Sequence, residues 1–189
     1  TTVVKIETEN GIVGWGEAQS PVSPNTTATI IKDIVEPLTI GKDIYDVESI
    51  WHNNYSSKRE RGHYTGFYID AICGVDIAIW DAIGKSLNMP TCKAMGGAHR
   101  KSVALYNGIG GTEPEEVADQ AEWSVSKGYK FVKMHLKENL EKDIEIARKV
   151  RERVGDSIGI MIDVHMGFDT FNVIKLGKEL EKLNLLWIE

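Results

Sequence analysis

The sequence predicts an α/β protein in which an α+β region precedes a parallel sheet built from βα units. Alternating apolar residues flank an Asn-Gly pair near the N-terminus, and amphipathic helical stretches follow them. From residue 103 onward, short apolar runs recur at about the length of one βα unit, with a helical stretch between neighbouring runs. Strands that alternate with helices in this way form a parallel sheet.

The composition excludes several classes of protein. Of the 189 residues, 42% are hydrophobic and 26% are charged, which supplies enough apolar surface for a core and differs from a disordered chain. The net charge is −6 without a basic block, so we expect no nucleic-acid partner and no membrane partner. No window reaches the roughly 20 apolar residues of a membrane span. Cys73 and Cys92 lack metal-binding spacing, and we interpret them as free thiols of a cytoplasmic protein.

The first region is predicted to be a hairpin followed by helices. Val3–Thr8 and Ile12–Glu17 have the alternation of half-buried strands, and the Asn10-Gly11 pair between them is a strong hairpin signal. Apolar residues then recur at helical spacing, and the last of these stretches has a broad apolar face. We predict helices over residues 26–40, 47–58 and 66–88.

The second region is predicted to contain four parallel strands. Its first helix has local support, because Thr112 precedes Pro114 as an N-cap does and Gly128 ends the helix. The spacing fits either a doubly wound sheet or part of an eight-stranded barrel. Since no helix follows the last strand to cover the sheet, we expect a fragment of a longer protein. The predicted strands are Val103–Ile109, Tyr129–Leu136, Ile158–Val164 and Leu185–Ile188, with helices over 113–127, 139–154 and 170–183.

Ionisable residues end three consecutive strands of this region. Active sites of parallel α/β folds lie at the carboxyl ends of strands. There the chain carries Lys133 with His135, Asp163 with His165, and finally Glu189. Alternation along each strand predicts that both members of a pair point to the same face. Taken singly, each residue has a commoner structural explanation, such as a helix cap, a hydrogen-bonded histidine or a surface charge, but their coincidence favours a site.

The two acids in this set suggest a metal ion. Mg²⁺ prefers a few carboxylate oxygens and keeps positions open for substrate oxygens. Asp163 and Glu189 fit that role, and one further acid is expected. Lys137 is interpreted as the start of a solvated loop outside the site. Gly108–Gly111 follows a strand but lacks the dinucleotide-binding spacing, so we do not expect a bound nucleotide.

Motifs along the whole chain resemble the enolase superfamily, in its mandelate racemase branch. Asp163 is one of the residues that carry the resemblance. The others are Gly14-Trp15-Gly16-Glu17-Ala18, Asp76 through Asp81, Gly84-Lys85, Met95-Gly96-Gly97, Gly128 through Lys133, and Trp187-Ile188-Glu189. The resemblance implies an α+β capping domain over 1–98, with its first strand missing, and the first half of a modified TIM barrel over 99–189. It also implies Mg²⁺ as the cofactor, held by Asp163 and Glu189, with the third ligand and later acid–base residues outside the chain.

At two positions the sequence differs from many members of this branch, and these differences suggest which reaction is catalysed. His135 stands where many members have a second lysine, and Asp163-Val164-His165 replaces the Asp-x-Asn of many members. The Asp-x-His pattern resembles sugar-acid dehydratases that act on galactonate, gluconate or mannonate. In that case His165 is the acid or base, while Lys133 and His135 contact the substrate carboxylate or share the proton transfer.

The expected activity is therefore a Mg²⁺-dependent dehydration of a sugar acid. Abstraction of the proton α to the carboxylate gives an enediolate, and loss of the β-hydroxyl yields a 2-keto-3-deoxy acid. The alternatives are a racemase, epimerase or cycloisomerase of the same superfamily, or a non-catalytic binding module that kept the fold. The whole protein is expected to be a homo-oligomer with a small-molecule substrate, and the fragment by itself is expected to be inactive.

Overall fold

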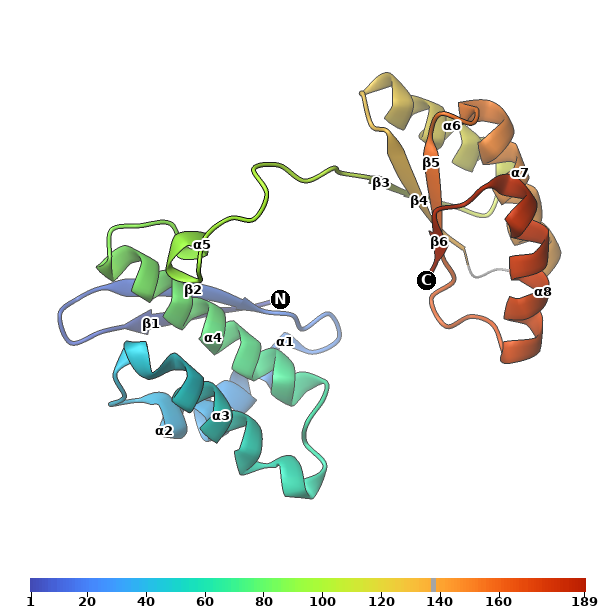
Figure 1. Ribbon diagram of the computed structural model, residues 1–189. Helices are drawn as coiled ribbons and strands as arrows, with labels where there is room; N and C mark the ends of the chain where they lie inside the picture. The colour runs from blue at the N-terminus through green and yellow to red at the C-terminus, as the bar shows by residue number, and fades with distance from the viewer. Residues whose placement is uncertain (137–138) are drawn as a thin grey trace. The chain divides into compact units, whose positions relative to one another are not determined.

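The computed structural model describes residues 1–136 and 139–189 and divides into two compact units, Thr1–Lys101 and Ser102–Glu189 (Figure 1). The first unit is a hairpin with helices, and the second is a parallel sheet with helices. Lys137, interpreted as the start of a loop, lies outside the described residues. Within those residues, none of the helices has the length and apolar character needed to cross a bilayer.

The predicted hairpin of the first unit is confirmed. Strands β1 (Thr2–Glu7) and β2 (Val13–Ala18) are antiparallel, and Gly11 has the positive φ of 81° that their connection requires. The hairpin lies along helix α4 (Phe67–Ser86) in Figure 1. A Cβ built on Gly16 would lie 2.0 Å from the carbonyl oxygen of Gly74, so β2 approaches the helix backbone more closely than any side chain would allow.

The helix predicted over residues 26–40 is present, but it is not α-helical throughout. It consists of α1 (Pro24–Ile30), a wider π turn (Ile31–Val35) and α2 (Glu36–Thr39). Pro37 has no N–H to donate to the preceding turn, and its ring clashes with a regular helical backbone there. A π turn therefore replaces regular α-helix before Pro37. The other helical segments of this unit are Ile44–Asp46 (3₁₀), α3 (Val47–Ser57), Arg59–Arg61 (3₁₀) and α5 (Thr91–Ala94).

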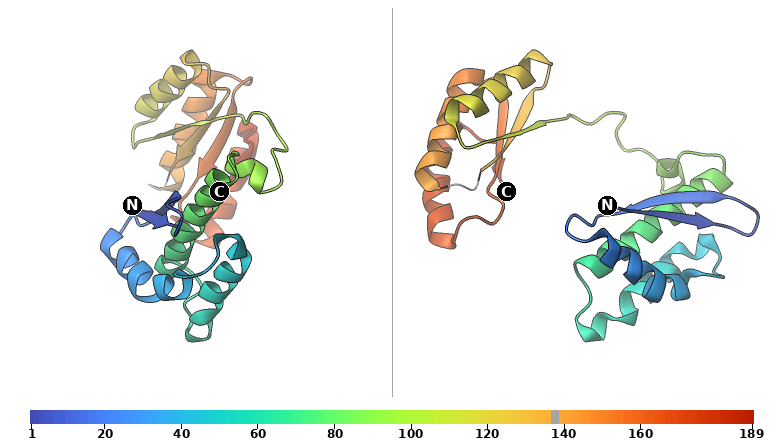
Figure 2. Two further views of the ribbon diagram at one scale, coloured as in Figure 1. Left: turned by 90° about the vertical axis from the view of Figure 1, so that its left-hand side faces the viewer. Right: turned by 180° about the vertical axis from the view of Figure 1, so that it is seen from behind.

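The second unit is a four-stranded parallel sheet of a partial barrel. Its strands run in the order β3 (Asn107–Gly110), β4 (Phe131–His135), β5 (Gly159–Asp163) and β6 (Trp187–Ile188). The helices between them lie on one face of the sheet in both views of Figure 2. They are α6 (Pro114–Ser126), α7 (Leu140–Val154) and α8 (Thr170–Leu180), the last continued by a 3₁₀ turn over Glu181–Leu183.

The core of this unit fills the space between the sheet and its helices. Alternate strand residues, including Val132, Met134, Ile160 and Ile162, are buried there with apolar residues of the helices. The remaining positions of each strand face the other side, which leaves that side free to carry polar residues at the strand ends.

The first predicted strand of this unit is shorter than expected. The run Val103–Ile109 enters the sheet only at Asn107, whose partner in β4 is Val132. Because β4 itself begins at Phe131, one position before Val132, the residues before Tyr106 have no neighbouring strand to pair with, and the side chain of Val103 is 74% exposed.

Candidate active site

The strand register gathers the predicted residues at one edge of the sheet. His135 is the partner of Asp163 across β4 and β5, and Lys133 precedes His135 by two residues on the same face. The backbone of Glu189 extends the pairing beyond β6, since its N–H donates to the carbonyl oxygen of Ile162 at 2.8 Å. Its own carbonyl oxygen accepts from the N–H of Val164 at 3.0 Å. Three strands thus deliver their terminal residues to one place.

Lys133 joins the two acids. Its ammonium nitrogen Nζ lies 3.0 Å from Oδ2 of Asp163 and donates to Oε2 of Glu189 at 2.5 Å. The side chains of Lys133 and Asp163 are only 8% and 10% exposed, whereas that of Glu189 is 60% exposed. Both carboxylates therefore reach a single cationic group, here the lysine ammonium.

These contacts fix the charge of the pair. The hydrogen bond from Lys133, followed by that from the backbone N–H of His165, holds the pKa of Asp163 below its usual value of 3.8. The hydrogen bond to Glu189, and then the one to Asp163, raises the pKa of Lys133 above its usual range. At neutral pH Asp163 is a carboxylate and Lys133 an ammonium, so Lys133 in this arrangement donates hydrogen bonds and does not accept a proton.

Two imidazoles flank Asp163 on opposite oxygens. Nδ1 of His135 lies 3.6 Å from Oδ2 of Asp163, and Nδ1 of His165 lies 3.6 Å from Oδ1. The ring centroids of the two histidines are 6.2 Å apart, and their side chains are 48% and 66% exposed. A molecule placed above Asp163 would meet both rings.

His165 reaches this place by a different route from the one predicted. Strand β5 ends at Asp163, so alternation along a strand does not orient His165, and that part of the prediction is wrong. Instead His165 and Met166 have positive φ values of 51° and 59°, and the N–H of Gly167 donates to the carbonyl oxygen of Val164 at 2.7 Å. The N–H of His165 donates to Oδ1 of Asp163 at 2.9 Å. A tight turn therefore folds the histidine back over the acid.

Two neighbours of the site escaped the sequence prediction. The ring of Tyr106 lies 5.9 Å from Nζ of Lys133, which is a cation–π distance. Gly108 is the β3 partner of Lys133, and a Cβ built on it would lie 3.7 Å from Nε2 of His135. Alternation within β3 puts Gly108 on the face that carries Lys133 and is the signal that would have revealed it, whereas Tyr106 comes just before β3 and no strand pattern places its ring.

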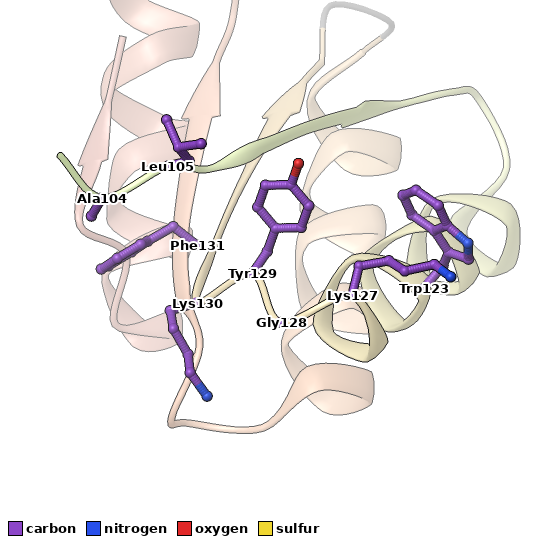
Figure 3. Close-up of a pocket in the computed structure, with 8 residues that line it drawn as sticks. All are labelled: Ala104, Leu105, Trp123, Lys127, Gly128, Tyr129, Lys130 and Phe131. Carbon is purple, nitrogen blue, oxygen red and sulfur yellow. The ribbon is translucent and has the colours of Figure 1, made fainter. Parts of the chain in front are cut away.

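A hollow at the other end of the strands lacks this chemistry. It has a volume of about 510 Å³ and lies where β4 begins (Figure 3). In it the ammonium of Lys127 lies 5.6 Å from the centre of the Trp123 ring. Its lining is Ala104, Leu105, Trp123, Lys127, Gly128, Tyr129, Lys130 and Phe131.

The arrangement defines a class of protein: a hairpin-and-helix unit, followed by a partial parallel barrel whose strands end in acids, a lysine and imidazoles. The chain belongs to the enolase superfamily. Residues 1–96 match the mandelate racemase / muconate lactonizing enzyme N-terminal domain, and residues 116–189 match the enolase C-terminal domain-like family.

Similar proteins carry several activities. The arabinonate dehydratase of Saccharolobus solfataricus is 31% identical over 98% of this chain and 50% of the relative. The N-succinyl-L-Arg/Lys racemase of Bacillus cereus is 31% identical over 99% and 50%. The crystal structure of the 3,6-anhydro-D-galactonate cycloisomerase from Zobellia galactanivorans superposes with a TM-score of 0.86 and 28% identity over 98% of this chain and 52% of that one. The chain spans about half the length of the curated relatives it matches.

Proposed function

We propose that this chain is the capping domain and first half-barrel of a Mg²⁺-dependent sugar-acid dehydratase, called the whole enzyme below. The observation that carries the proposal is the position of His165 beside Asp163, with His135 on the other side of the same carboxylate. Dehydration needs a base for the α-proton and an acid for the leaving hydroxyl. Two imidazoles at one carboxylate can fill both roles, and imidazole titrates near neutral pH.

The donor set fits a magnesium ion. Asp163 and Glu189 each place a carboxylate oxygen beside the Lys133 ammonium, so both carboxylates already contact the same positive charge. These two residues would hold Mg²⁺, together with a ligand from outside the chain. Bound there, the ion would neutralise charge on the substrate carboxylate and make the neighbouring carbon more acidic.

The remaining steps belong to the residues of this chain. The ammonium of Lys133 is held in place by two carboxylates and is available to hydrogen-bond a substrate carboxylate. His165 removes the proton from the α-carbon or, if a later strand supplies the base, protonates the departing β-hydroxyl; His135 is placed to share that transfer. The C–O bond breaks, water leaves, and the resulting enol becomes a 2-keto-3-deoxy acid.

The test is a product assay on the whole enzyme. A panel of sugar acids is incubated with it, and 2-keto acid formation is measured; at least one substrate is expected to give the product. Asp163→Asn is expected to abolish that turnover while the protein stays folded. Unchanged turnover in this variant would refute the assignment of Asp163.

A second candidate is a racemase or cycloisomerase, favoured by the similarity to the Bacillus cereus racemase at the same 31% identity as the dehydratase. Such an enzyme would use the same proton abstraction without losing the hydroxyl. Exchange of the α-proton with deuterium from solvent, with no 2-keto acid formed, would identify this second activity.

A further inference from the structure

Three donor atoms beside the acid pair have the spacing of metal ligands. One atom each from His135, Asp163 and His165 all lie within 4.8 Å of one another. Each Nδ1 atom is 3.6 Å from an oxygen of Asp163. Ligands that share a zinc ion at about 2.0–2.2 Å stand roughly 3–4 Å apart, so small side-chain movements suffice to bring all three onto one ion.

Of the three candidate ligands, Asp163 is held in place, whereas the two histidines are open to solvent. Asp163 is fixed by Lys133 and by the N–H of His165, while both imidazoles are about half exposed or more. Across from His135, Gly108 contributes no side chain that would fill the space. A cation can therefore reach the imidazole nitrogens from solvent.

The donor atoms of this set differ in kind from those of the two proposed magnesium ligands. Asp163 and Glu189 offer oxygen alone, which suits Mg²⁺, whereas two imidazoles and one carboxylate suit Zn²⁺, Ni²⁺ or Cu²⁺. We propose that His135, Asp163 and His165 form a second, nitrogen-rich site that selects Zn²⁺ over Mg²⁺. The two sites share Asp163. If the proposed function is correct, a bound Zn²⁺ ion takes this ligand from Mg²⁺ and inhibits the reaction; the binding itself does not depend on that function.

The first experiment measures zinc binding without any assay of activity. The whole enzyme is stripped of metal, and Zn²⁺ is titrated in competition with a chromophoric chelator. One Zn²⁺ per chain is expected, with affinity at least about tenfold weaker in His135→Asn and in His165→Asn. His99→Asn, in an exposed position of the first unit, is the matched control and should bind as the unaltered protein does.

Two outcomes of this titration overturn the proposal. One is equal zinc affinity in the unaltered protein and in both site histidine variants. The other is a loss of zinc affinity in Glu189→Gln that matches or exceeds the loss in His135→Asn, because that would place Zn²⁺ among the oxygen ligands.

A second measurement needs no variant and therefore does not depend on how the variants fold. Cu²⁺ added to the metal-stripped enzyme is expected to give an electron paramagnetic resonance spectrum with splitting from imidazole nitrogen. A spectrum from oxygen ligands alone refutes the site. If the dehydratase proposal is wrong, the product assay will show it. The Zn²⁺ titration and the Cu²⁺ spectrum would still test the metal site.

Discussion

The ammonium of Lys133 lies 3.0 Å from Oδ2 of Asp163, and both side chains are about nine-tenths buried. The same ammonium reaches Glu189, which is largely exposed. Lys133 therefore holds together two acids that would otherwise repel each other at the strand ends. Its removal leaves a buried carboxylate without its cationic partner, which is an unfavourable arrangement for any ionised group.

Lys133→Met tests this relationship. Methionine keeps the length of the side chain but removes the charge and both hydrogen bonds, so the pKa of Asp163 is expected to rise and kcat/KM of the whole enzyme to fall at least about 100-fold. The control is Lys130→Met, an exposed lysine just before the start of β4, which should stay within about twofold. Activity of Lys133→Met near that of the control would remove Lys133 from the site.

The capping unit offers a prediction about close packing. A Cβ on Gly16 would lie 2.0 Å from the Gly74 carbonyl oxygen, so Gly16→Ala must push β2 away from α4. We expect a loss of about 1–3 kcal/mol in the free energy of unfolding, measured by urea titration. Gly177→Ala in α8 is the matched control, because its new Cβ would meet only Ile188 Cδ1 at 4.0 Å. It should gain about 0.5–1 kcal/mol, and destabilisation of similar size in both variants would contradict the argument.

In the turn after β5, a substitution is expected to stabilise the protein. Met166 has a φ of 59° and is 96% exposed, so it carries the cost of a left-handed conformation without compensating burial. Met166→Gly is expected to raise the midpoint of urea unfolding. Met95→Gly, at an exposed methionine with a φ of −83°, should lower it by the entropy cost of glycine. If both substitutions lower the midpoint, the turn is not strained.

Periodicity and turn chemistry were sufficient to predict most of the fold. The Asn10-Gly11 hairpin and the three βα units with their final strand depend on local patterns, and they occur where the sequence places them. The π turn at Ile31–Val35 was missed because helical spacing of apolar residues outweighed the single signal of Pro37. Val103 was assigned to a strand from its apolar neighbours alone, although strand formation also needs a partner at the same level of the sheet.

The sequence predicts which residues form the site better than it predicts how their side chains contact one another. Strand ends identify Lys133, His135 and Asp163, because parallel register brings such ends together. No local pattern shows that Lys133 bridges Asp163 and Glu189, since that contact joins side chains 56 positions apart along the chain. The left-handed turn is equally hidden, because it also requires a positive φ at Met166, and methionine is not a residue that typically signals one.

Asp81 provides a pH-dependent test in the capping unit. Its Oδ2 accepts hydrogen bonds from Nζ of Lys85 at 2.5 Å and from the N–H of Trp15 at 2.8 Å. Lys85 also donates to the carbonyl oxygen of Val13 at 2.9 Å, so this acid ties α4 to the hairpin. The hydrogen bond from Lys85, and then that from Trp15, lowers the pKa of Asp81 below 3.8.

A lowered native pKa fixes the sign of the pH dependence. Asp81 stabilises the folded protein fully above its unfolded pKa, and the stabilisation is lost as the pH falls through the native value. Asp81→Asn should therefore cost about 1 kcal/mol at pH 7, and this difference from the unaltered protein should become smaller at an acidic pH below 3.8, where Asp81 begins to take up a proton. Urea unfolding at both pH values measures it, with Asp33→Asn, at an exposed acid of the first unit, as the control. A difference of the same size at both pH values would show that the charge of Asp81 contributes nothing to the attachment of the hairpin.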